Sequence, residues 1–90
     1  GADTASASGT MNAAMEDFAF LPARLEVASG TTIVWTNRGQ VPHTVTAEDK
    51  TFDSGEIQPG EQRRLTFTRA GTFQFNCTPH PFMRGVIVVR

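Results

Sequence analysis

The sequence predicts an all-β protein, an antiparallel β-sandwich of seven or eight short strands. Several segments of about five residues alternate polar and apolar side chains with the period of a strand. Turn signals rich in Gly, Pro, Asn and Asp separate these segments, and none has helical periodicity. Since 90 residues make one domain, we expect one sandwich with loops gathered at its ends.

The N-terminal segment, residues 1–10, contains mainly Ala, Ser, Thr and Gly. A composition so poor in apolar side chains cannot bury a core, so we expect a flexible segment. It is either a native linker or a remnant of expression, and a native segment could follow a lipid anchor. The single folded domain is then expected at residues 11–90.

The first half of the domain contains three expected strands, at residues 11–15, 24–28 and 32–36, and an aromatic stretch at 18–21 that ends at Pro22. Residues 24–28 alternate so that Leu25 and Val27 face the core. Residues 32–36 are β-branched and aromatic, which places Ile33 and Trp35 on a second core-facing surface. Ser-Gly and Asn-Arg-Gly turn signals follow these last two strands.

The second half contains four more expected strands, at residues 43–47, 62–68, 72–77 and 85–90. A surface loop at 48–56 is expected to cover Phe52. Pro and Gly at the two central positions of residues 58–61 predict a type II turn. We expect residues 69–71 to close a hairpin between the strands that flank them. The last segment is apolar on both faces, which is typical of a central strand.

Charge and composition exclude several classes of protein. Eight basic and nine acidic residues give a net charge of −1, which argues against a nucleic-acid surface and favours a protein partner. Five arginines lie in the C-terminal third: Arg63, Arg64, Arg69, Arg84 and Arg90. They could form a docking surface, but an ordinary solvated face is the commoner interpretation of such charges. No apolar run could span a bilayer, and one Cys excludes an intramolecular disulfide.

The segment 77–83 carries the densest set of soft metal ligands in the chain. It contains Cys77, His80 and Met83, and His43 is the only other histidine. Taken singly, a Cys or Met is usually core filler and a His beside prolines is usually a loop residue. Together, two His, one Cys and a weak Met form the ligand set of a blue-copper site. A structural zinc site would need four strong N or S ligands, which this chain lacks.

The pattern Cys77-x-x-His80-x-x-Met83, with Pro42-His43 upstream, resembles the copper-binding pattern of the cupredoxins. Its short ligand loop, followed by Arg-Gly, is similar to that of the amicyanins within this family. Many cupredoxins place Asn directly after the first His, where it ties the two ligand loops together, whereas this chain has Thr44. The resemblance implies a Greek-key sandwich or barrel with one copper ion, held by His43, Cys77 and His80 with Met83 as the axial ligand.

The resemblance also implies a function. A small type 1 copper protein would carry one electron at a time between larger redox partners through Cu(I) and Cu(II), with electrons passing through His80. Pro79, Pro81 and Phe82 would surround the His80 edge as an apolar docking patch. Similarity to amicyanins implies a dehydrogenase donor, a c-type cytochrome acceptor and export to the periplasm or another extracytoplasmic compartment, with or without a membrane tether.

Two other functional classes use copper in proteins of this kind. A copper enzyme of the oxidase or nitrite reductase kind needs a second copper centre, and two histidines leave none over for it. The expectation is therefore that the chain is not an enzyme. A copper chaperone or storage protein remains the alternative, because it would use the same ligands for Cu(I) and release the ion readily. A monomer is the expected oligomeric state.

Overall fold

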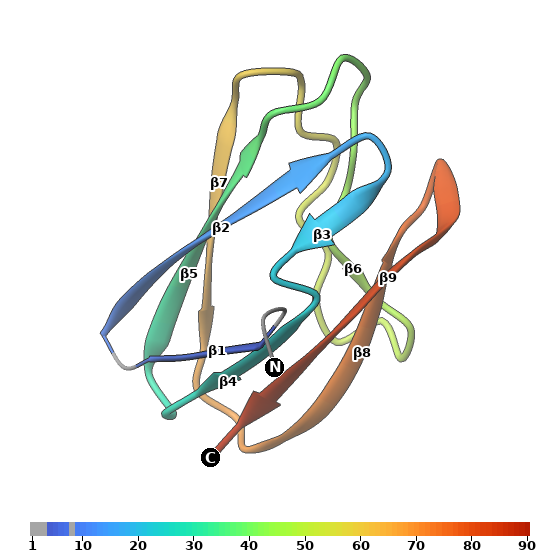
Figure 1. Cartoon of the computed structure of the whole chain (residues 1–90). Helices are drawn as coiled ribbons and strands as arrows, with labels where there is room; N and C mark the ends of the chain where they lie inside the picture. Colours follow the sequence, from blue (N-terminus) through green and yellow to red (C-terminus); the bar gives the residue numbers. More distant parts are fainter. Residues whose placement is uncertain (1–3, 8) are drawn as a thin grey trace.

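The structure, a computed structural model, describes residues 4–7 and 9–90. Within these residues the chain forms nine strands and no helix: β1 Thr4–Ala7, β2 Thr10–Glu16, β3 Ala19–Leu21, β4 Arg24–Val27, β5 Thr31–Asn37, β6 Thr46–Ala47, β7 Gln62–Phe67, β8 Gly71–Cys77 and β9 His80–Val89. One sheet has the order β1-β4-β9-β8-β6 and the other the order β3-β2-β5-β7, and the two form the layers of a sandwich (Figure 1). The predicted all-β sandwich is confirmed.

The two sheets are mixed rather than purely antiparallel. Strand pairs β1–β4, β2–β5 and β4–β9 are parallel, and the other pairs are antiparallel. Parallel neighbours arise because the chain repeatedly passes from one sheet to the other, so that strands distant in the sequence become adjacent. Strand β9, for example, lies between β4 and β8, which confirms the predicted central position of the last strand.

The turn at residues 69–71 does not close a hairpin, so that prediction was wrong. Strand β7 belongs to the four-stranded sheet and β8 to the five-stranded sheet. Phe67 and Phe73 both pack on the core between the sheets, one from each side. A connection that crosses from one sheet to the other packs both rings on the core between the two layers. The local alternation of polar and apolar residues is the same for a crossing and for a hairpin, so it cannot distinguish them.

Strand β1 precedes the first predicted strand. Its residues pair in parallel with β4, from Thr4 opposite Arg24 to Ala7 opposite Val27. Sheet pairing uses backbone N–H and C=O groups, so a segment without large apolar side chains can still pair. Of the rest of the expected flexible segment, residues 1–3 and 8 lie outside the described residues, and Thr10 is the first residue of β2.

The core fills the space between the two sheets. Trp35 is fully buried and meets the rings of Phe67 and Phe75 edge to face, each at a centroid distance of 6.1 Å. Leu25, Val27 and Ile33 are buried beside it, so their predicted inward orientation is confirmed. The prediction for Phe52 is also confirmed, because its ring packs against Phe67 at 5.0 Å.

Two segments near the expected ligands differ from the predicted strands. Only Thr46–Ala47 of residues 43–47 belongs to a strand, although His43 forms an isolated bridge with Ile57. Strand β9 begins at His80 instead of residue 85, because Cys77 pairs with His80 across a tight turn. The predicted turn at residues 58–61 is confirmed by the 2.9 Å hydrogen bond from Glu61 N–H to the Gln58 carbonyl, with Gly60 at φ 86°.

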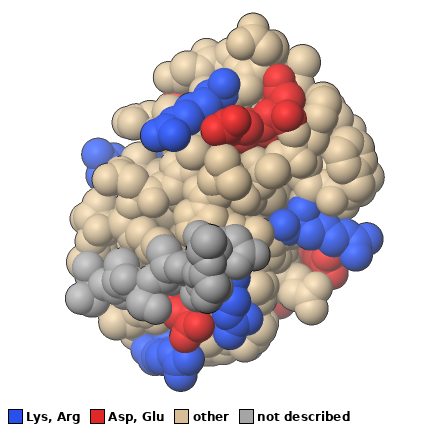
Figure 2. Space-filling model, viewed as in Figure 1, with Lys and Arg blue, Asp and Glu red and all other residues tan. Residues whose placement is uncertain are grey.

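Acidic and basic side chains are interspersed on the face in Figure 2, without a large field of one sign. Arg90 pairs with Glu26, while Arg63 donates to the backbone carbonyls of Ser54 and Glu56. These arginines therefore act in separate local contacts. Among the residues described, no helix has the length and apolar character needed to cross a membrane.

Candidate metal centre

His43 lies in the connection between β5 and β6 and is fixed by its backbone. Its N–H donates to the Ile57 carbonyl at 3.1 Å, and its carbonyl accepts from the Ile57 N–H at 2.8 Å. The residue is completely buried. Because both backbone groups are hydrogen-bonded, the backbone of His43 is fixed in place. The position of the imidazole ring can then change only by rotation about the side-chain torsions.

Cys77 and His80 come from the turn between β8 and β9. Cys77 ends β8 with its thiol completely buried, as the strand parity predicted, and His80 opens β9 with a half-buried side chain. The pairing register shifts between Asn76 and Cys77. Such an irregularity changes the direction of a side chain at the end of a strand, here beside the two histidines.

The three side chains converge on one point. The distance from Cys77 Sγ is 3.5 Å to His43 Nδ1 and 3.6 Å to His80 Nδ1, and one ligand atom from each residue lies within 4.8 Å of the others. A metal about 2.0 Å from a nitrogen and about 2.3 Å from a sulfur leaves those two atoms roughly 3.5 Å apart at a tetrahedral or trigonal angle. His43, Cys77 and His80 are therefore positioned to bind one metal ion.

Met83 is the fourth side chain expected from the sequence. It lies on β9, is 1% exposed, and belongs to the same buried cluster as Cys77. A buried methionine at this position fits a thioether beside the three stronger donors, and it fits core packing equally well. The donor set of two imidazoles, one thiolate and a nearby thioether suits copper better than the hard cations, which prefer oxygen.

Thr44 joins the two segments that carry the candidate ligands. Its backbone N–H donates to Cys77 Sγ at 3.4 Å. Its hydroxyl accepts from the Thr78 N–H at 2.9 Å and lies 3.2 Å from the Thr78 hydroxyl. Thr44 therefore ties together the two segments that carry the candidate ligands.

Asp17, which the sequence analysis missed, contacts the far side of the His43 ring. It lies in the turn between β2 and β3, and its Oδ1 is 2.6 Å from His43 Nε2. The hydrogen bond from the Gln40 backbone N–H, and then that from His43, hold the pKa of Asp17 below its ordinary value. No local pattern marks this contact, because 26 residues separate the two side chains.

Phe18, also missed, places an aromatic ring against the candidate site. Its centroid is 4.8 Å from the ring of His80 and 5.7 Å from that of Phe82. Phe18 is 48% exposed and Phe82 68% exposed. The half-buried edge of His80 therefore lies among exposed aromatic surface contributed by the β2–β3 turn and by the start of β9.

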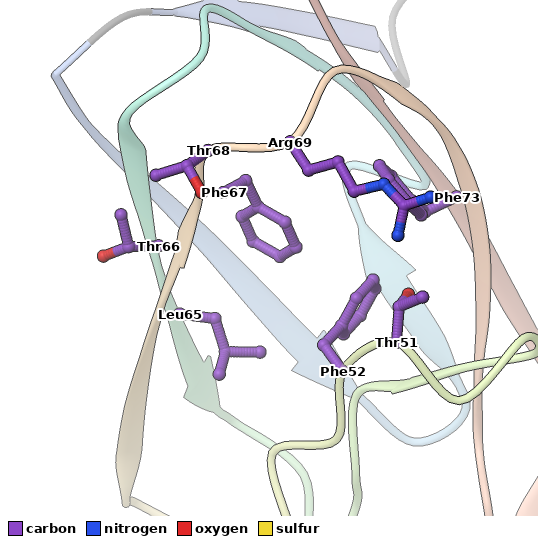
Figure 3. A pocket seen from close by; sticks show the side chains of 8 residues that line it. All are labelled: Thr51, Phe52, Leu65, Thr66, Phe67, Thr68, Arg69 and Phe73. Carbon is purple, nitrogen blue, oxygen red and sulfur yellow. The ribbon is translucent and has the colours of Figure 1, made fainter.

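A cavity of about 290 Å³ lies elsewhere in the sandwich (Figure 3). The rings of Phe52, Phe67 and Phe73 line it together with Leu65 and the side chain of Arg69. None of the candidate metal ligands contributes to its wall. The cavity has the apolar character of an incompletely closed core edge.

Comparison with known proteins gives a family and several relatives. The profile of the family described as copper binding proteins, plastocyanin/azurin family, matches residues 7–90. Amicyanin from Paracoccus denitrificans is 40% identical over 70 residues, which cover 72% of this chain and 53% of that protein. Chloroplastic plastocyanin from Fritillaria agrestis is 35% identical over 75 residues, covering 69% of this chain and 45% of that one.

A solved structure of similar shape is the Cu(I) form of an amicyanin mutant. It superposes with a TM-score of 0.83 at 34% identity and covers 91% of this chain and 83% of that one. The strand arrangement around the His–Cys cluster is thus shared with a protein whose structure is described in a copper form. This chain spans about half the length of the amicyanin and plastocyanin sequences that it matches.

Proposed function

The chain belongs to the plastocyanin/azurin family of copper-binding proteins, and from this premise we propose that it is a small type 1 copper protein that carries single electrons between larger redox proteins. Family membership supports a blue copper electron carrier rather than an enzyme. Copper supplies the chemistry when bound, because a site of this donor type cycles between Cu(I) and Cu(II). The copper-binding domain is assigned to residues 11–90, which the family match includes.

The assigned ligands are His43, Cys77, His80 and Met83. The single observation that carries the proposal is the convergence of two imidazole Nδ1 atoms on Cys77 Sγ at 3.5 and 3.6 Å. Met83 is assigned as the weak axial ligand on the basis of its burial and its place in the ligand segment. Three strong donors and one weak donor would give a coordination geometry between those that Cu(I) and Cu(II) prefer.

The chain holds these donors with little freedom to rearrange. The His43 backbone is doubly paired with Ile57, and Thr44 is bonded to both Cys77 and Thr78. Pro79 and Pro81 fix φ on both sides of His80. A site that moves little between oxidation states has a small reorganisation cost, which suits rapid electron transfer.

The proposed contact with redox partners is the exposed surface around His80, formed with Pro79, Pro81 and Phe82. Phe82 is the most exposed large apolar side chain among the residues described, at 68%. Exposed apolar surface of this kind suits a weak, short-lived encounter. On the model of the amicyanin relative, the partners are a dehydrogenase as donor and a c-type cytochrome as acceptor, docking with the monomer.

The compartment follows from the same comparison. An exported location, periplasmic or otherwise extracytoplasmic, is proposed, with or without a membrane tether. An unpaired cysteine in an exported protein needs an explanation, and binding of a metal by the buried Cys77 thiol supplies one.

Voltammetry of the copper-loaded protein, combined with competition by a Cu(I) chelator, tests the proposed function. An electron carrier should give a reversible one-electron wave and should retain copper in both oxidation states. Rapid loss of Cu(I) to the chelator, without a reversible wave, would instead indicate the copper chaperone or storage alternative. That result would overturn the electron-carrier proposal while leaving copper binding in place.

The docking surface has its own matched test. Phe82→Ala should slow electron transfer to a c-type cytochrome without changing the potential, because Phe82 is not a proposed ligand. Leu21→Ala is the control, since Leu21 is also exposed, at 43%, but makes none of the aromatic contacts around His80. Equal rates for the two variants would contradict docking at Phe82.

A further inference from the structure

The buried ring of His43 has two nitrogens with different partners. Nδ1 lies 3.5 Å from Cys77 Sγ, on the side where the three candidate ligands converge. Nε2 lies 2.6 Å from Asp17 Oδ1. A carboxylate only accepts hydrogen bonds, so this contact requires the proton on Nε2 and leaves the Nδ1 lone pair free. The contact with Asp17 therefore leaves Nδ1, the nitrogen that faces the other candidate ligands, available to bind a metal.

The Asp17 carboxylate is itself held in place. The Gln40 backbone N–H donates to Oδ2 at 2.7 Å while Oδ1 faces the imidazole. The side chain of Asp17 is only 20% exposed, and that of His43 is not exposed at all. A hydrogen bond between a charged and a neutral group, partly shielded from water, is stronger and better directed than one in full solvent.

Gly39 makes room for this arrangement. A Cβ atom at position 39 would lie 2.1 Å from Asp17 Oδ1 and 3.0 Å from His43 Nε2. Contacts this short are not tolerated, so any other residue here would displace the carboxylate from the ring. Gly39, in the connection between β5 and β6, therefore leaves the space that the Asp17 carboxylate, in the β2–β3 turn, needs to contact His43.

We propose that Asp17 is a positioning residue for the metal centre, which fixes His43 in the Nε2–H tautomer and strengthens Nδ1 as a donor. This inference rests on the proposed function, because it assigns Asp17 a role toward the copper site. Partners on the outer nitrogen of a ligand histidine set its tautomer and orientation and raise its basicity. A more basic imidazole favours Cu(II) over Cu(I), so Asp17 lowers the reduction potential.

The first test reads the tautomer in the metal-free protein. Long-range ¹H–¹⁵N NMR correlations distinguish the two neutral forms of a histidine ring. We expect the proton of His43 on Nε2 in the wild-type protein, and a loss of that preference in Asp17→Ala. A wild-type ring protonated on Nδ1 would overturn the proposal without any variant having to fold. Because no copper is needed, this outcome is independent of whether the electron-carrier proposal holds.

The second test separates positioning from general stability. Asp17→Ala should weaken copper binding by about 10- to 100-fold, the usual effect of losing such a partner, and raise the reduction potential. Gly39→Ala should shift both in the same direction, since it displaces the same carboxylate. Glu16→Ala is the control: it removes an equal charge from the adjacent, exposed residue, which makes no hydrogen bond or ion pair with His43 among the residues described. If Asp17→Ala and Glu16→Ala give equal affinities and potentials, the proposal fails.

Discussion

At the residue scale, Thr44 connects the two segments that carry the candidate ligands. Its hydroxyl accepts from the Thr78 N–H at 2.9 Å, and its N–H donates to Cys77 Sγ at 3.4 Å. One residue therefore fixes the thiol and also ties the β8–β9 turn to the segment of His43. The hydroxyl is buried and also lies 2.9 Å from the hydroxyl of Thr46. Its loss removes the acceptor of the Thr78 N–H, while the Thr46 hydroxyl keeps its bond to Asp53.

Thr44→Val should lower the free energy of unfolding by about 1–3 kcal/mol, because it keeps the shape of the side chain and removes the acceptor of the Thr78 N–H. Chemical denaturation of the metal-free protein measures this change. Thr44→Ser retains the hydroxyl and is the matched control. Equal losses in the Val and Ser variants would show that the methyl group, and not the hydrogen bond, carries the effect.

Met83 makes the second residue-scale prediction. Met83→Gln should keep the blue site and lower the reduction potential, since an oxygen donor stabilises Cu(II) relative to Cu(I) more than a thioether does. Voltammetry measures the shift. Met83→Leu, which removes the donor at similar volume, should shift the potential in the opposite direction. If neither variant changed the potential, Met83 would be a core residue and not a ligand.

At the element scale, strands β4 and β9 pair in parallel at the centre of one sheet, and Glu26 connects their ends. Its carboxylate accepts from Arg90 at 2.6 Å and from Arg24 at 3.3 Å. The hydrogen bond from Arg90, followed by that from Arg24, lowers the pKa of Glu26. A carboxyl group with a lowered folded-state pKa stabilises the fold above its unfolded pKa and loses that contribution as pH falls through the folded value.

The stability of the metal-free protein should therefore fall more steeply below about pH 4.3, the ordinary pKa of Glu, than that of Glu26→Gln. Above that pH the wild-type protein should be the more stable, and the difference should disappear in more acidic solution. Unfolding by denaturant at several pH values measures the two curves. Parallel curves across the acidic range would mean that the exposed arginines are screened and contribute nothing through Glu26.

Strand positions were predicted better from the sequence than strand pairing. Alternation located β4, β5, β7 and β8 to within about one residue and oriented Trp35 and Cys77 correctly, because side-chain period follows directly from strand geometry. Pairing was harder. Parallel neighbours, the crossing after Phe67 and the strand β1 depend on contacts between distant segments, which local periodicity does not contain.

The candidate site divides in the same way. The sequence was sufficient to identify His43, Cys77 and His80 as candidate ligands, because soft ligands are rare in this chain and their chemistry is distinctive. Asp17 and Phe18 could not, since a carboxylate and a phenyl ring in a turn are common and gain meaning only when the β2–β3 turn folds over the His43 and His80 rings. Thr44 was visible as a departure from the pattern, but its bonds required the structure.

At the scale of the whole molecule, the sandwich collects parts of one site from three turns. The turn between β2 and β3 supplies Asp17, the β5–β6 connection supplies His43, and the β8–β9 turn supplies Cys77 and His80. These turns are distant in the sequence but lie together in the folded chain. The metal centre therefore exists only when both sheets are assembled, and the rigidity of the site is that of the sandwich.

In the proposed centre, this assembled site holds copper through the Cys77 thiolate. The visible and EPR spectra of the Cu(II)-loaded protein test it most directly. A trigonal His43–Cys77–His80 site should give an intense visible charge-transfer band and a small copper hyperfine splitting, because the thiolate shares its electron density with the metal. Cys77→Ser should lose both. A weak visible spectrum with a large hyperfine splitting in the wild-type protein, or a band that persists in Cys77→Ser, would show that the Cys77 thiolate does not bind the copper ion.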